Sequence, residues 1–87
     1  MRRSDQLTIF DEIVLEREWQ DTKYGSLDER NPTVKEWLDI MHSELLEVYF
    51  AKTENKRMEE LLQVVAVGVA CLEQYGVVRR PELAERE

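Results

Sequence analysis

Several features that would assign this chain to a class of protein are scarce or missing. Cys71 is the only cysteine, so no disulfide can form within the chain, and there are only two prolines and three glycines. The longest segment rich in apolar residues, 61–72, is too short to span a bilayer. Charged and polar residues follow Met1, where a secretory signal peptide needs an apolar stretch. We therefore expect an intracellular, cytoplasmic protein with no membrane segment.

Positive charge is also in short supply. The chain has 12 Lys and Arg against 19 Asp and Glu, which gives a formal net charge of −7. Nucleic-acid backbones and anionic membranes both attract basic surfaces, so we expect direct binding to neither. An acidic protein still binds phosphates when divalent cations lie between the two. The charge alone also motivates a third idea, that the chain is an acidic mimic of DNA that captures a DNA-binding protein.

Hydrophobic residues make up 43% of the chain and recur mainly every three or four residues, which is the period of an amphipathic helix. A first helix is expected from a cap at Ser4 or Asp5 as far as Gly25. The polar residues 25–31 then indicate a loop. The apolar residues of this first helix are Leu7, Phe10, Ile13, Val14 and Trp19.

Two further helices are predicted after this loop. Pro32 suits the first turn of a second helix, and Thr33 with Glu36 forms a plausible capping box. Asn55 is expected to cap a third helix, which ends at Gly76. The connection between the second and third helices is short enough for an antiparallel pair.

The predicted fold is all-α, with residues 1–87 in a single domain built on this antiparallel helix hairpin. Residues 77–87 are expected to form a short helix or a tail. A single domain of 87 residues has a modest core, so self-association would stabilise it. We therefore expect a helical bundle that is completed by oligomerisation.

Acidic and amide side chains occur at two matching places in the second and third helices. Glu44 lies on the apolar stripe of the second helix, and Glu47 is three residues later, so the two carboxylates share a face. Glu60 and Gln63 have the same spacing in the third helix. If the turn is centred near Glu54, the two pairs lie at the same two levels, to within one residue or about 1.5 Å.

Three carboxylates and one amide oxygen in one small volume suit Mg²⁺ or Mn²⁺, which prefer hard oxygen ligands. Such ions would relieve the repulsion between the carboxylates and could hold a polyphosphate. A simpler interpretation is that Glu pairs at this spacing lie on solvated helix faces. In that case Glu59 and Glu60, near a helix start, only complement the helix dipole.

The arrangement Glu44-Leu45-Leu46-Glu47, then a short connection, then Glu60-Leu61-Leu62-Gln63 resembles the MazG-like all-α nucleoside triphosphate pyrophosphohydrolases. Their hallmark is ExxE on one helix and ExxD on the next. Segments 16–25 and 59–67 also resemble parts of some short members, and the resemblance covers roughly residues 10–76. It implies a Mg²⁺-dependent enzyme that cleaves NTPs or dNTPs to the monophosphate and pyrophosphate.

The resemblance implies roles for individual residues. Glu44, Glu47 and Glu60 match the first three acidic positions of the motif, so they are expected to bind the metal and to be catalytic. Gln63 stands where the family has Asp; it keeps an oxygen but no charge, which implies weaker metal binding and a specialised or inactive member. Family members build the site in dimers or tetramers, so a homodimer or homotetramer is expected.

Several further residues are candidates for substrate binding. Trp19, Trp37 and Tyr24 offer aromatic faces on which a base could stack, and Lys23 and Arg79 are candidate phosphate contacts. Trp37 also fits the hydrophobic core, and Arg79 also fits a charged tail; these simpler interpretations are favoured. The alternative to an enzyme is a non-catalytic helical module, a degenerate relative that binds nucleotides or protein partners.

Overall fold

Five helices make up the computed structural model, which describes residues 3–84 and the side chains of residues 5–83. They are α1 (Arg3–Tyr24), α2 (Leu27–Arg30), α3 (Val34–Tyr49), α4 (Glu54–Tyr75) and α5 (Pro81–Ala84). The described part of the chain contains no strand, so the predicted all-α class is confirmed. Within the same residues, no helix combines the length and the apolar content needed to cross a membrane.

The capping box predicted at Thr33 and Glu36 and the predicted end of α4 at Gly76 are confirmed, whereas Pro32 precedes the N-cap and does not lie in the first turn of α3. Glu36 N donates to Thr33 Oγ1 at 3.1 Å, and Thr33 N donates to Glu36 Oε1 at 3.0 Å, so these residues form a capping box. The hydrogen bonds to Thr33 also lower the pKa of Glu36, because they favour its charged form. Gly76 ends α4 with φ of 90°, a conformation that L side chains rarely adopt.

Two predicted helix starts are wrong. Thr53, not Asn55, caps α4, because its Oγ1 accepts from Lys56 N at 3.1 Å while Asn55 already lies in the first turn. At the other end of the chain α1 already includes Arg3, so neither Ser4 nor Asp5 is its cap.

The loop predicted for residues 25–31 contains α2, which is a correction of the expected organisation. Ser26 is its N-cap, and Ser26 N donates to Glu29 Oε2 at 3.3 Å. Asn31 ends the helix in the left-handed conformation, with φ of 44°. The segment 77–87, left open between a short helix and a tail, forms α5 over Pro81–Ala84, and residues 85–87 lie outside the described part.

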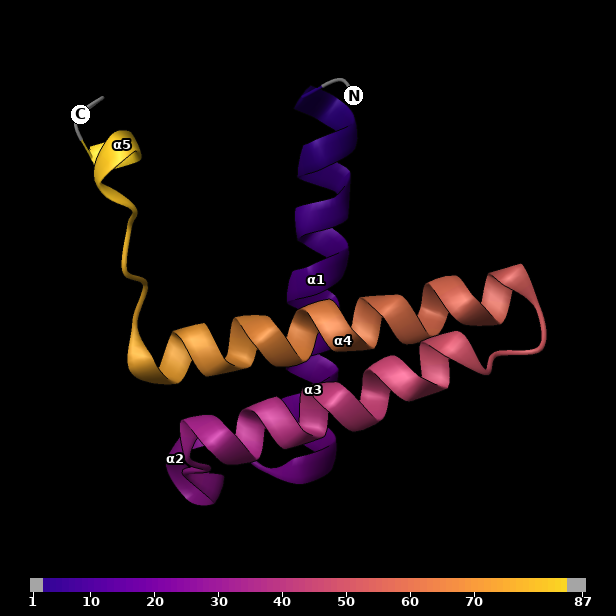
Figure 1. Cartoon of the computed structure of the whole chain (residues 1–87), viewed down its shortest axis with the longest axis horizontal. Helices are drawn as coiled ribbons and strands as arrows, with labels where there is room; N and C mark the ends of the chain where they lie inside the picture. The colour runs from indigo at the N-terminus through magenta and orange to yellow at the C-terminus, as the bar shows by residue number, and fades with distance from the viewer. Residues whose placement is uncertain (1–2, 85–87) are drawn as a thin grey trace.

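Helices α3 and α4 are joined by residues 50–53 and run alongside each other in opposite directions (Figure 1). Their contact is close at Gly68, where an added Cβ would lie 3.3 Å from Met41 Cε. The small buried core consists of Trp37 from α3 with Ala66, Val67 and Ala70 from α4. Cys71, a free and half-buried cysteine, packs against it with Leu27 and Met41.

Helix α1 crosses α3 and α4 at a steep angle, and its N-terminal half extends beyond them (Figure 1). The residues of α1 that are buried or half-buried recur at helical spacing but are mostly polar: Ile13, Glu16, Arg17, Gln20 and Asp21. The apolar residues predicted for this helix, apart from Ile13, are at least half exposed. Within one chain, α1 therefore packs through its polar face and leaves its apolar face uncovered.

Arg17 carries much of the contact between α1 and α4. Its side chain is buried, with 5% exposure, and its Nε donates to Glu73 Oε2 of α4 at 2.7 Å. Its other nitrogens donate to Gln20 at 3.2 Å and to Asp21 at 3.1 Å. A guanidinium with these partners is well satisfied in spite of its burial.

We expect Arg17→Met to lower the free energy of unfolding by about 1.5–3 kcal/mol, because it removes charge-assisted hydrogen bonds between two helices. Lys35→Met is the matched control, since the Lys35–Asp39 pair is exposed and should contribute less than about 1 kcal/mol. Urea unfolding followed by circular dichroism measures both. Equal losses in the two variants would contradict the structural role of Arg17.

Candidate metal centre

Three carboxylates from two helices converge beside the α3–α4 contact. Glu44 and Glu47 come from α3 and Glu60 comes from α4, and one oxygen of each lies within 4.8 Å of the other two. Helical spacing explains the convergence within α3, because residues three apart share a face. Packing of α4 against α3 supplies the third group. The structure therefore brings together the three acidic residues that the sequence singled out.

Two oxygens of this cluster are buried and have no hydrogen-bond partner, namely Glu44 Oε2 and Glu60 Oε2. Glu60 is buried as a residue, with 8% exposure, and its Oε1 accepts from Lys56 Nζ at 3.3 Å. The same lysine contacts Glu59 Oε2 at 3.3 Å, so its charge is shared. Buried, unpartnered carboxylate oxygens are costly, and a cation that satisfies them would remove this cost.

The protonation equilibrium of Glu44 reflects this environment. Burial is the main cause that raises its pKa, and the negative charges of Glu47 and Glu60 add to the effect. The charged form of Glu44 is thus disfavoured when no cation is bound. A divalent cation reverses the local electrostatics and favours the charged carboxylates.

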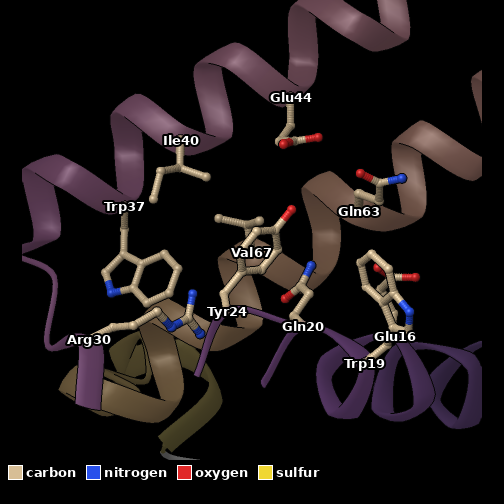
Figure 2. Close-up of a pocket in the computed structure, with 10 residues that line it drawn as sticks. All are labelled: Glu16, Trp19, Gln20, Tyr24, Arg30, Trp37, Ile40, Glu44, Gln63 and Val67. Carbon is tan, nitrogen blue, oxygen red and sulfur yellow. The ribbon is translucent and has the colours of Figure 1, made fainter. Parts of the chain in front are cut away.

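A cavity of about 390 Å³ opens beside the carboxylates (Figure 2). Figure 2 shows Glu44 and Gln63 at one end, with Glu16 of α1 facing them, and Trp37 and Arg30 at the other end. The remaining lining residues are Trp19, Gln20, Tyr24, Ile40 and Val67. The volume lies in the range of small-molecule sites, and the lining combines aromatic surface with a few polar groups.

The predicted substrate-binding residues have different surroundings. Trp19 lines the cavity and is half exposed, whereas Trp37 is almost fully buried and donates from Nε1 to Gln74 Oε1 at 2.8 Å. Trp37 is thus mainly a core residue whose ring also reaches the cavity. Lys23 lies over the Trp19 ring, 4.8 Å from its centroid. Arg79 lies in the exposed segment between α4 and α5 and does not line the cavity.

Sequence reasoning missed two residues of the site, Glu16 and Arg30. Glu16 lies on the polar face of α1, and the periodicity of apolar residues does not identify residues on that face. Arg30 lies in α2, within the segment predicted as a loop; it stacks on Trp37 at 5.4 Å, and its Nε is buried without a partner. The Ser26-x-x-Glu29 pattern was the available signal for α2.

The combined lining can hold a hard cation at one end of the cavity and an aromatic or hydrogen-bonding group at the other. The chain matches no protein-family model, and it has no significant match among curated proteins or solved structures. Function is therefore inferred from the geometry and chemistry of these residues.

Replacing Glu44 by Gln should raise the free energy of unfolding at pH 7 in the absence of divalent cations, because it removes a half-buried charge that neighbouring carboxylates repel. A raised pKa means that the folded state binds the proton more tightly than the unfolded state. In the wild type, the charged Glu44 therefore lowers the free energy of unfolding above its raised pKa, and this effect disappears below the ordinary Glu pKa of 4.5. Below pH 4.5 the stability gained in Glu44→Gln should vanish.

Urea unfolding at pH 7 and pH 4, with a chelator present, measures this difference. Glu12→Gln, an exposed carboxylate on α1, is the control and should change little at either pH. A Glu44→Gln variant that is less stable than the wild type at pH 7 would contradict the electrostatic interpretation.

Proposed function

We propose that this chain is a Mg²⁺-dependent nucleotide pyrophosphohydrolase, which converts an NTP or dNTP and water to the monophosphate and pyrophosphate. The observation that carries the proposal is the triad Glu44, Glu47 and Glu60, with its two buried, unpartnered oxygens, beside a cavity of ligand size. The resemblance of these residues and Gln63 to the MazG-like motif supports the same activity. We place the enzyme in the cytoplasm, where its nucleotide substrates are found.

The donor set fits Mg²⁺ or Mn²⁺. Glu44, Glu47 and Glu60 supply carboxylate oxygens and Gln63 an amide oxygen, with no His or Cys to select a softer metal. When bound, the divalent ion would bind the phosphates of the substrate, neutralise their charge and lower the pKa of an attacking water. The reaction breaks one phosphoanhydride bond, and the oxygen of water is retained on one of the two products.

The other lining residues would bind the rest of the nucleotide. Tyr24 and Trp19 present aromatic surface for the base. Lys23 does not line the cavity, but its Nζ lies over these two rings, 5.1 and 4.8 Å from their centroids. Arg30 closes the far end of the cavity with a guanidinium anchored by Asp21 Oδ1 at 3.3 Å. Burial of the base between these groups would orient the phosphates toward the carboxylates.

A specific observation favours a second candidate, a nucleotide-binding protein without turnover. Gln63 is neutral, so the donor set carries one negative charge fewer than four carboxylates would. Weak metal binding could then suffice to hold a nucleotide but not to hydrolyse it. Calorimetry with Mg²⁺ and a non-hydrolysable nucleotide distinguishes the cases: binding without turnover indicates a sensor, and no binding indicates a protein-interaction module.

The expected activity is release of pyrophosphate from at least one common ribo- or deoxynucleoside triphosphate in the presence of Mg²⁺. Glu60→Gln should lower kcat/KM about 100-fold or more, because it removes the buried ligand of the ion. Glu59→Gln is the control: this residue is adjacent and also contacts Lys56, but it is exposed and outside the triad. Folded wild-type protein that releases no pyrophosphate from any of these nucleotides would remove the enzymatic claim.

We also propose that the chain functions as a homodimer or homotetramer, in which a helix hairpin from each copy completes a bundle. The exposed apolar face of α1 supports this assembly: Leu7, Phe10 and Val14 are 50%, 57% and 55% exposed and recur at helical spacing. A second copy packed on this face would remove from water the apolar surface that one chain leaves uncovered.

Phe10→Glu combined with Val14→Glu should convert the assembly to a monomer, because each buried carboxylate would lack a partner. Val77→Glu with Val78→Glu is the matched control, which places two charges on exposed apolar residues outside α1. Sedimentation equilibrium measures the mass, and circular dichroism checks the fold. A wild-type chain that is monomeric at micromolar concentration would refute the proposed assembly.

A further inference from the structure

We propose that Glu16, on α1, is the fourth carboxylate of the cation site. From across the cavity it would accept hydrogen bonds from water molecules that are bound to the ion. This inference rests on the proposed cation site and extends it to a helix that contributes none of the three clustered carboxylates. It assigns α1 a direct part in metal binding.

Glu16 lies between two cavities beside the triad. Glu16 and Gln63 both line the 390 Å³ cavity and also a second cavity of about 290 Å³ next to it, so they lie on the boundary between the two. Figure 2 shows the side chain of Glu16 on the α1 side of the cavity, facing Gln63 of α4, with Glu44 above them. Glu16 therefore faces the one member of the donor set that lacks a charge.

Glu16 also lies in an unfavourable electrostatic environment. Burial raises the pKa of Glu16, and the negative charge of Glu60 raises it further, so these two carboxylates are close enough to repel each other. Glu16 and Glu44 also line the same cavity, so carboxylates from two different helices face one space.

No protein cation accounts for this charge. Among the ion pairs of residues 5–83, none involves Glu16, and the adjacent Arg17 is already bound to Asp21 and Glu73. The only lysine that contacts the triad within the same residues is Lys56, which binds Glu60 Oε1 and is shared with Glu59.

A buried atom gives independent evidence that a ligand belongs here. Glu60 is more than nine-tenths buried, yet its Oε2 has no hydrogen-bond partner. This oxygen belongs to the carboxylate whose charge acts on Glu16. A cation beside Glu60 would satisfy the oxygen and would also remove the repulsion that Glu16 experiences.

The distances define the role of Glu16. It is not among the carboxylates whose oxygens lie within 4.8 Å of one another, so it is not a fourth member of that compact triad. Hydrated Mg²⁺ keeps several of its waters when proteins bind it, and these waters need acceptors. A carboxylate across the cavity can accept from them, and loss of such an outer partner typically weakens metal binding about 10- to 100-fold.

The test is titration of the full chain with Mn²⁺ alone, followed by electron paramagnetic resonance and calorimetry. Glu16→Gln should weaken Mn²⁺ binding about 10- to 100-fold. Glu12→Gln and Glu18→Gln, which change exposed carboxylates on the same helix, should bind as the wild type does. Glu16→Gln is nearly isosteric and removes a repelled charge, so we expect it to fold, and circular dichroism verifies this.

A second variant tests whether the lost charge is the cause. Glu16→Gln combined with Gln63→Glu moves one carboxylate from α1 to α4 and should recover most of the Mn²⁺ affinity. If the double variant binds no better than Glu16→Gln, the loss comes from altered packing and the inference is overturned.

The outcomes separate this inference from the proposed function. Wild-type protein that binds Mn²⁺, with Glu16→Gln binding equally well, overturns the role of Glu16 and leaves the triad intact. Wild-type protein that binds no Mn²⁺ overturns the cation site itself.

Discussion

Repulsion between carboxylates held together by helix packing is the interaction on which the functional account depends. The close contact of α3 and α4 at Gly68 and around Trp37 brings Glu60 next to Glu44 and Glu47. Apolar residues stabilise this contact between the helices. The same contact holds three carboxylates close together at a partly buried position, where their negative charges repel one another. A bound cation would remove this repulsion and satisfy the buried carboxylate oxygens.

Helix α1 connects this site to the rest of the molecule. Its polar face carries Arg17, which joins α1 to α4 through Glu73, and Glu16, which faces the cavity. The ion pair of Arg17 thus holds α1 against α4 at the residue next to Glu16. The other face of α1 is apolar and exposed, because the rest of the described chain packs on the polar face. The packing, the cavity and the proposed assembly thus depend on the same helix.

The sequence was sufficient for the all-α class, the capping box at Thr33 and the pairing of Glu44 and Glu47 with Glu60, because these depend on local periodicity and short spacing. It did not predict the orientation of α1. Apolar periodicity marks Leu7, Phe10 and Val14, which are exposed, whereas the structure packs the polar side of the helix through Arg17. Helix α2 was missed because four residues give little periodic signal, and Arg30 was missed with it.

Diffraction from crystals soaked in Mn²⁺, with data collected at the manganese edge, tests the central claim most directly. The account predicts an anomalous peak within coordination distance of carboxylate oxygens of Glu44, Glu47 and Glu60. A map without a peak there, from crystals in which those three side chains are ordered, would contradict it.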